Sequence, residues 1–186
     1  VPTELQKLES ALGKTCIQTI FLEKRVAERL SENDAAIFHT HLMILEDRSF
    51  INKLEQEIKG GHSAAYALEK IVANYIEAFA KMDDPYLRER AVDMEDIGRR
   101  ILANLVGDEV DHALYLKHPS VLVARVILPS DMAALDNDQI LGIITEDSET
   151  NSHAVIMAKS MGIPAIVGAR GALRQIAPED DLIIDA

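Results

Sequence analysis

The chain contains 186 residues, of which 48% are hydrophobic and 27% charged, which is enough for one hydrophobic core or two small ones. Its formal net charge of −12 argues against nucleic acid as a partner, because binding to phosphate backbones relies on clustered Lys and Arg. The sequence has no apolar run of about 18 residues, and Cys16 is its one cysteine. We therefore expect no membrane insertion and no disulfide, and a cytoplasmic location.

Residues 1–107 carry hydrophobic side chains at helical spacing and predict a compact bundle of helices. The first helix places its apolar residues on one stripe and runs to about Leu30. Ser31 and Asp34 are suited to open a second helix, because both side chains cap helix starts.

Glycine, serine and proline mark the remaining helices of the bundle. Gly60 and Gly61 are expected to end a third helix, and Ser63 to begin a fourth. Pro85 fits the first turn of a fifth helix, which should stop near Gly107.

After a polar connector, 108–118, the pattern changes to short apolar strands that alternate with short helices. The predicted strands are 121–128, 139–145, 164–167 and 181–185. Such alternation is typical of a small layered α/β domain, here 119–186. The expected fold is therefore α+β overall, with a helical bundle over 1–107 followed by this domain.

One histidine, His153, follows the predicted strand 139–145 and a polar loop, at the start of a helix. The carboxyl end of a parallel strand is where such a sheet exposes its chemistry. Ser152 fits the N-cap, and the N–H groups and positive dipole end of the helix favour an anion beside the imidazole. Because a neutral imidazole is a nucleophile near neutral pH, the pattern predicts a histidine that carries a phosphoryl group.

The segment 151–168 reads Asn-Ser-His-Ala-Val-Ile-Met-Ala-Lys, followed by Ser-Met-Gly-Ile-Pro-Ala-Ile-Val-Gly. It resembles the phosphohistidine domain of the phosphoenolpyruvate (PEP)-utilising enzymes. Two stretches of the bundle, 38–47 and 84–91, look like the helical part of Enzyme I, the PEP-protein phosphotransferase of the sugar phosphotransferase system. The resemblance implies an amino-terminal Enzyme I domain, with a carrier-binding helical subdomain and a swivelling phosphohistidine subdomain. The nitrogen-regulatory and multidomain branches of Enzyme I both stay open.

This resemblance assigns roles to individual residues, with His153 as the phosphoryl carrier. The residues that support the phosphate are Asn151, Ser152 and Lys159. Those that contact the carrier protein are Glu32, His41, Glu46 and Asp47. No metal site is expected, and His39 and His41 stand two residues apart, so they point to different helix faces.

The implied partners are an HPr-like phosphocarrier protein and the PEP-binding C-terminal barrel of the parent protein. That barrel is missing from this chain, so we expect an excised domain that does not use PEP alone. No cofactor is expected in this fragment, since Mg²⁺ would come only with the barrel.

The loop before His153 departs from the family pattern, because Glu149 stands where glycines are usual. Lys159 replaces the commoner arginine, and Met132 stands near the position of a supporting threonine. Two alternatives remain open. One is the swivelling domain of a pyruvate phosphate dikinase or PEP synthase, which leaves the bundle unexplained. The other is a degenerate, non-catalytic interaction module, for which Glu149 and the lost glycines argue.

Overall fold

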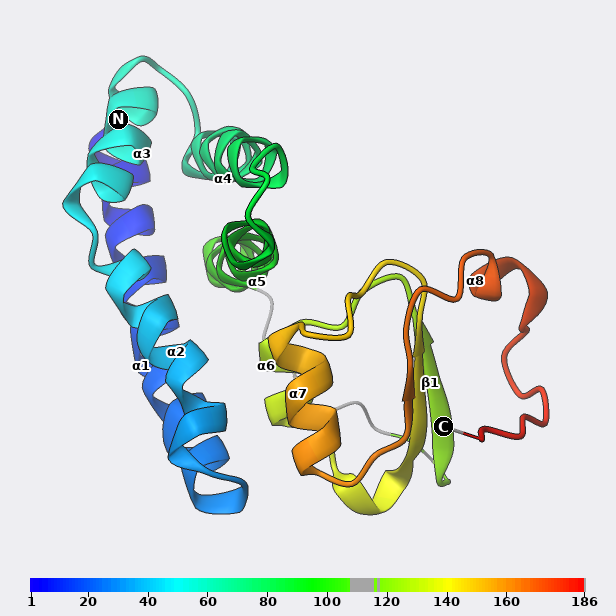
Figure 1. The fold of residues 1–186 in the computed structure, drawn as a ribbon. Helices are drawn as coiled ribbons and strands as arrows, with labels where there is room; N and C mark the ends of the chain where they lie inside the picture. Colours follow the sequence, from blue (N-terminus) through cyan, green and yellow to red (C-terminus); the bar gives the residue numbers. More distant parts are fainter. Residues whose placement is uncertain (108–115, 117, 186) are drawn as a thin grey trace. The chain divides into compact units, whose positions relative to one another are not determined.

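The computed structural model of the chain describes residues 1–107, 116 and 118–185. These residues are mostly helical, with a small parallel β-sheet, which confirms the predicted α+β class (Figure 1). They fall into two compact units. The helical unit comprises Val1–Lys24 and the chain from Ala36 to residue 107, and the α/β unit comprises Arg25–Ala35 and the described residues from 116 onward.

Residues 1–107 form the helices α1 Pro2–Arg29, α2 Glu32–Leu45, α3 Arg48–Lys59, α4 Ala64–Ala80 and α5 Pro85–Val106. The predicted boundary residues lie at their ends. The Asp34 N–H donates to Ser31 Oγ at 3.1 Å, and the Tyr66 N–H donates to the N-cap Ser63 Oγ at 3.2 Å. Gly107 ends α5 with φ of 78°, a left-handed conformation that glycine adopts without steric cost.

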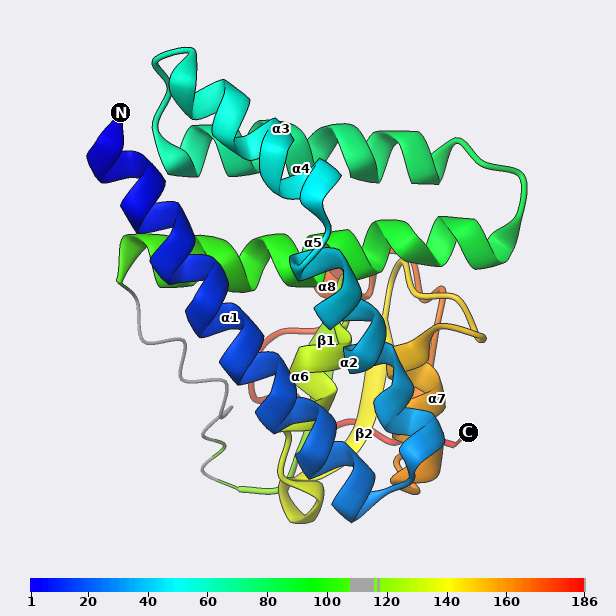
Figure 2. The ribbon, with the colours of Figure 1, turned by 90° about the vertical axis from the view of Figure 1, so that its left-hand side faces the viewer.

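One hydrophobic core fills the helical unit, with contributions from every one of its helices. Leu54 and Ile97 lose all solvent exposure in this core. Helices α4 and α5 pack side by side along their length (Figure 2). A Cβ atom built on Gly98 of α5 would lie 2.9 Å from Val72 Cγ1 of α4, so the close approach of the two helices depends on this glycine.

The α/β unit contains a three-stranded parallel sheet in the order β1-β2-β3. Its elements are β1 Ser120–Ala124, α6 Pro129–Ala134, η1 Asn137–Gln139, β2 Ile140–Thr145, α7 His153–Ser160, β3 Ala165–Ile166 and α8 Ala172–Gln175. Helices α6 and α7 cover one face of the sheet, and α8 with the chain that follows it lies on the other side (Figure 1). The carboxyl end of β2 therefore leads through a loop to the first turn of α7.

The sequence-based strands need two corrections. The strand predicted at 121–128 ends at Ala124, because Leu128 is already the N-cap of α6. The strand predicted at 181–185 does not form, and Ile183 there is 99% exposed. Ile184 instead packs its side chain against β2. A Cβ atom built on Gly142 would lie 2.5 Å from Ile184 Cδ1.

The loop end of the α1–α2 hairpin, Arg25–Ala35, clusters with the α/β unit, whereas the sequence analysis assigned it to the bundle. Arg29 Nη1 donates to Leu135 O at 3.3 Å, and Ser160 Oγ donates to Asp34 Oδ1 at 3.0 Å. The predicted connector, 108–118, lies outside the described residues apart from 116 and 118. None of the described helices is long and apolar enough to span a membrane.

Candidate functional site around His153

His153 is the first residue of α7, and its side chain is half-buried. The preceding residue, Ser152, is the N-cap, and its Oγ accepts a hydrogen bond from the Val155 N–H at 3.3 Å. This contact satisfies one of the amide groups that a helix start leaves without an intrahelical partner. The imidazole therefore lies beside the positive end of the helix dipole, where a negatively charged group is stabilised.

The loop between β2 and α7 is held at both ends. The Ser152 N–H donates to Glu149 O at 3.1 Å, which closes a turn directly before the helix. At the β2 end, Glu146 Oε1 accepts from the Leu173 N–H at 3.1 Å and so ties the loop to α8. The Glu149 side chain is exposed. Its carboxylate is therefore hydrated, which weakens its repulsion of an anion near His153.

The predicted phosphate-supporting residues lie at two different places on α7. Asn151 and Ser152 directly precede His153, and the Asn151 side chain is exposed. Lys159 is exposed in the last turn of α7, about 9 Å along the helix axis from His153 at 1.5 Å per residue. The structure therefore brings Asn151 and Ser152 to the histidine, whereas Lys159 lies at the opposite end of the helix.

Three of the predicted carrier contacts, Glu32, Glu46 and Asp47, have exposed side chains. Glu32 is the first residue of α2, and the other two follow its last residue. Asp47 has a second role as the N-cap of α3, where Oδ1 accepts from the Phe50 N–H at 2.7 Å. The Asp47 carboxylate therefore caps α3 and is also exposed at the surface.

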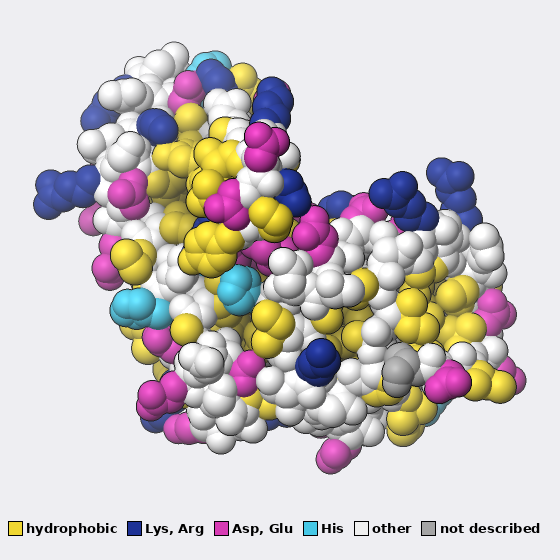
Figure 3. All heavy atoms as spheres, viewed as in Figure 1, with side chains coloured by type: hydrophobic (Ala, Val, Ile, Leu, Met, Phe, Trp, Pro, Cys, Tyr) yellow, Lys and Arg dark blue, Asp and Glu magenta, His cyan; other side chains and the backbone are white. Residues whose placement is uncertain are grey.

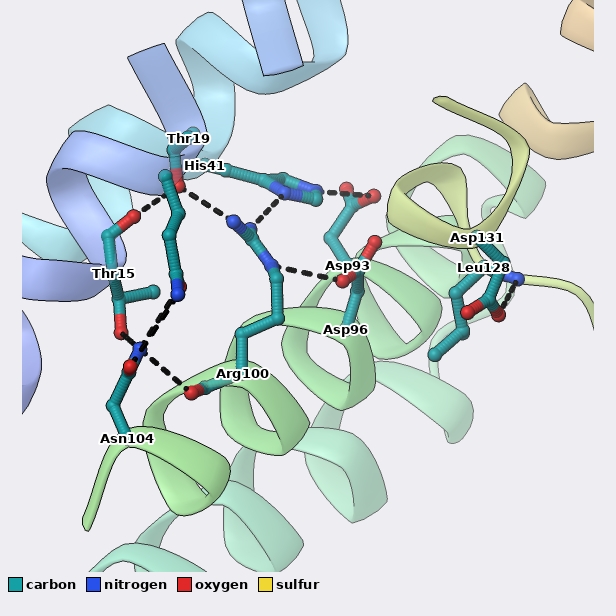
Figure 4. Close-up of polar contacts among 10 residues, drawn as sticks. Thr15, Thr19, His41, Asp93, Asp96, Arg100, Asn104, Leu128 and Asp131 are labelled. Atoms are coloured by element: carbon teal, nitrogen blue, oxygen red, sulfur yellow. Dashed lines mark hydrogen bonds and ion pairs between the residues drawn. The ribbon is translucent and has the colours of Figure 1, made fainter. Parts of the chain in front are cut away.

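The prediction that His41 contacts a carrier is wrong for this structure, because its side chain is fully buried. Arg100 Nη2 donates to His41 Nδ1 at 3.0 Å, and His41 Nε2 lies 3.4 Å from Asp93 Oδ1 (Figure 4). The Phe38 ring packs edge-on against the imidazole, with centroids 5.6 Å apart. His41 is therefore a structural member of a buried polar cluster.

This buried cluster joins three helices of the helical unit. Arg100 of α5 also donates to Asp96 Oδ1 at 3.1 Å and to Thr19 Oγ1 of α1 at 2.7 Å (Figure 4). Arg100 with Asp96, and Arg90 with Asp93, form ion pairs at helical spacing on α5. The sequence analysis missed this cluster, although Met94, Ile97 and Ile101 lie among these charges in the sequence.

Among the residues that the structure describes, no group of three or more His, Cys, Asp or Glu side chains is placed to hold a metal ion.

Two family models match the chain. The model described as PEP-utilising enzyme, N-terminal, matches residues 1–90, and the model described as PEP-utilising enzyme, mobile domain, matches residues 116–186. Among solved structures, an Enzyme I protein determined by NMR is 33% identical, with a TM-score of 0.70 over 94% of this chain and 71% of that chain. The N-terminal domain of a nitrogen Enzyme 1 is 30% identical, with a TM-score of 0.62 over 89% and 68%.

The chain belongs to the Enzyme I family of PEP-utilising enzymes. Its curated relatives include the PEP-protein phosphotransferases of Geobacillus stearothermophilus, at 33% identity, and Listeria monocytogenes, at 34% identity. Both alignments cover 100% of this chain but 32% of the relative. The chain thus spans about a third of the length of these Enzyme I relatives.

The candidate site residues are divided between the two PEP-utilising enzyme matches. The mobile-domain match contains the whole segment from β2 through α7 to β3, with His153 at its centre. The N-terminal match contains the exposed carboxylates of Glu32, Glu46 and Asp47. The dikinase alternative is not favoured, since these relatives and solved structures are of the Enzyme I type.

Proposed function

We propose that this chain is the phosphotransfer portion of an Enzyme I type PEP-protein phosphotransferase. In this proposal His153 receives a phosphoryl group that originates from PEP and passes it to an HPr-like carrier protein. PEP and Mg²⁺ would bind to a C-terminal domain of the parent protein, outside this chain. The protein would act in the cytoplasm, in a phosphotransferase system that serves sugar uptake or its regulation.

The position of His153 is the observation that carries the proposal. The half-buried imidazole stands at the first turn of α7, inside the segment that matches the mobile domain of the PEP-utilising enzymes. Ser152 fixes this turn through its hydrogen bond to the Val155 N–H. A phosphoryl group on the ring would therefore meet backbone N–H groups and the positive helix end.

The proposed chemistry needs one nucleophilic nitrogen and no protein base. Nδ1 of His153 is shielded from solvent, so we assign the attack to Nε2. As the Nε2–P bond forms, the P–O bond of PEP breaks and the enolate leaves with its electron pair. Onward transfer breaks the N–P bond while a histidine nitrogen of the carrier bonds to phosphorus. The loose transition state of such a transfer depends on positioning and charge stabilisation.

The carrier would dock on the helical unit through exposed carboxylates. Glu46 and Asp47 stand together between α2 and α3, and both are exposed. Acidic side chains are frequent on the α1 and α2 side of the molecule in Figure 3, and the chain has a net charge of −12. Because opposite charges steer association, the matching surface of the carrier should be basic.

Transfer of label from a phosphorylated HPr-like carrier tests the proposal. The chain is incubated with carrier that bears ³²P on its histidine, and the protein-bound label is then followed in acid and in alkali. Wild type should take up label that is lost in acid and kept in alkali, as expected for a phosphoramidate. His153→Ala should take up none, whereas the matched variant His39→Ala, which changes an exposed histidine of α2, should behave as wild type. Equal labelling of His153→Ala would refute the proposal.

A further inference from the structure

The loop that leads from β2 to α7 contains three acidic residues, and two of them are engaged. Glu146 Oε1 accepts a hydrogen bond from the Leu173 N–H at 3.1 Å. Asp147 Oδ2 forms an ion pair with Arg125 Nη1 at 3.3 Å. Among the described residues, no group pairs with the carboxylate of Glu149, which is exposed. The loop therefore presents one negative charge that no cation neutralises in this part of the structure.

The backbone keeps Glu149 close to His153. The Ser152 N–H donates to Glu149 O at 3.1 Å, so Glu149 begins a turn whose last residue directly precedes the histidine. Such a turn brings the Cα atoms of its first and fourth residues within about 7 Å of each other. The Glu149 carboxylate is therefore on the order of 10 Å from the imidazole, which is about the Debye length at 0.1 M salt.

The side chain of Glu149 contributes its charge to this loop and does not hold the loop's shape. The hydrogen bond of the turn uses the backbone oxygen of Glu149. The φ angle of Glu149 lies outside the left-handed region, so other side chains fit this backbone without strain. A substitution at this position therefore changes the charge beside His153 and leaves the turn in place.

The charge of Glu149 acts on the phosphorylated form of His153. A phosphoryl group adds about two negative charges near neutral pH. The positive end of α7 attracts these charges, whereas the Glu149 carboxylate repels them. Because the carboxylate is hydrated, repulsion over on the order of 10 Å corresponds to about a threefold change in an equilibrium constant at low salt.

We propose that Glu149 destabilises phosphorylated His153 and thereby shifts the equilibrium of phosphoryl transfer toward the carrier protein. The inference rests on the proposed function of His153 as a phosphoryl carrier. In the onward step the bond between His153 Nε2 and phosphorus breaks, and its electron pair stays on Nε2. A histidine nitrogen of the carrier bonds to phosphorus in its place. Since a bond of the same kind is broken and formed, a charge near one of the two histidines is enough to shift the equilibrium.

The equilibrium constant separates this role from a contact between Glu149 and the docked carrier. It compares the two free proteins before transfer with the two free proteins after transfer, so contacts within the complex do not enter. A charge at the rim of the complex would instead change the rate of association. A change in the equilibrium constant therefore reports repulsion between Glu149 and the phosphoryl group.

The test measures how ³²P distributes at equilibrium between this chain and an HPr-like carrier. At about 0.01 M salt, Glu149→Gln should lower the equilibrium constant for transfer to the carrier about threefold relative to wild type, and the charge reversal Glu149→Lys about tenfold. At about 1 M salt both differences from wild type should nearly vanish. The matched control Glu179→Gln removes an exposed carboxylate from the chain that follows α8, on the other side of the sheet (Figure 1). Its equilibrium constant should equal that of wild type.

Equal equilibrium constants for wild type, Glu149→Gln and Glu149→Lys would overturn the inference, whatever happens to the rate of transfer. An equal shift in Glu179→Gln would also overturn it, because the effect would then follow the net charge of the chain. So would a shift that persists at about 1 M salt, since a change in loop conformation is not screened. Failure of wild type to accept label would instead refute the proposed function.

Discussion

Arg100 donates a hydrogen bond from Nη2 to Nδ1 of His41 at 3.0 Å, and neither side chain is exposed to more than 1%. Guanidinium groups cannot accept hydrogen bonds, so Nδ1 of His41 must be unprotonated. The ring proton therefore sits on Nε2, which faces Asp93 Oδ1 at 3.4 Å. Thr19, His41 and Arg100 thus join α1, α2 and α5 through buried polar contacts.

Removal of the Arg100 guanidinium is expected to destabilise the helical unit strongly. Arg100→Leu would remove the buried guanidinium that pairs with Asp96 and would leave the His41 ring without its donor, a loss of roughly 3 kcal/mol in the free energy of unfolding. Urea denaturation measures this change. The neighbouring Arg99→Leu, at an exposed position of α5, is the matched control and should change stability by less than about 0.5 kcal/mol. Similar losses for the two variants would contradict the structural role of Arg100.

A variant that tests carrier docking at Asp47 has to preserve the N-cap that this residue forms for α3. Charge reversal there would remove the hydrogen bond to the Phe50 N–H and cost about 1 kcal/mol of stability. Asp47→Asn removes the charge and keeps a capping oxygen, and Glu46→Lys reverses an exposed charge that caps no helix. The double variant should bind an HPr-like carrier about tenfold more weakly by calorimetry, with unchanged thermal stability. Unchanged affinity would exclude both residues from the interface.

The contact between α1 and α4 should make stability depend on pH in acid. Lys7, which donates to Glu4, and the Ala64 N–H, which donates to Glu4 Oε2 at 2.9 Å, hold the pKa of Glu4 below its usual value. Since the folded-state pKa is the lower one, this stabilisation is present above the unfolded pKa of about 4.3 and is lost as pH falls through the folded pKa. Urea unfolding is measured at pH 7 and in steps below about pH 4.3. The free energy of unfolding should fall less over this range for Glu4→Gln than for wild type.

The variant Glu9→Gln, at an exposed position of the same helix, controls for the general effect of removing a carboxylate. It should follow the wild-type pH dependence. If the stability of Glu4→Gln also changes with pH as in wild type, the hydrogen bond from the Ala64 N–H to the Glu4 carboxylate does not stabilise the fold.

Cys16 should react slowly with alkylating agents. Burial raises the pKa of its thiol, and the charge of Glu46 raises it further, against a smaller opposing effect of Arg100. Because the thiolate is the reactive form, iodoacetamide at pH 8 should modify folded protein more slowly than urea-unfolded protein. Glu46→Gln should speed the reaction of the folded chain. If folded protein reacts as fast as unfolded protein, neither burial nor the charge of Glu46 protects the Cys16 thiol.

Helix boundaries could be predicted from the sequence because they depend on local chemistry. Ser63 and Gly107 act on backbone groups within a few residues, and both lie at the predicted ends. The positions of Ser152 and His153 could be predicted for the same reason. A strand, a loop and a capped helix that follow one another along the chain are enough to place the imidazole.

The environment of His41 could not be predicted in this way. Its partners, Asp93 and Arg100, lie 52 and 59 residues away along the chain, on a different helix. A pattern of exposed and buried positions along α2 alone does not reveal that a charged group from α5 fills the space beside it. The strand expected at 181–185 failed for a related reason, since a strand requires a hydrogen-bonding neighbour that an apolar run does not specify.

Identification of the phosphorylated residue shows whether His153 carries the phosphoryl group. The chain has six histidines, so uptake of label does not by itself say which of them accepts it. After transfer from a phosphorylated HPr-like carrier, digestion at alkaline pH and peptide sequencing by mass spectrometry locate the phosphoryl group. We expect a single modified peptide, with the phosphoryl group on His153. A phosphoryl group on a different histidine, with His153 unmodified, would contradict the assignment of His153 as the phosphoryl carrier.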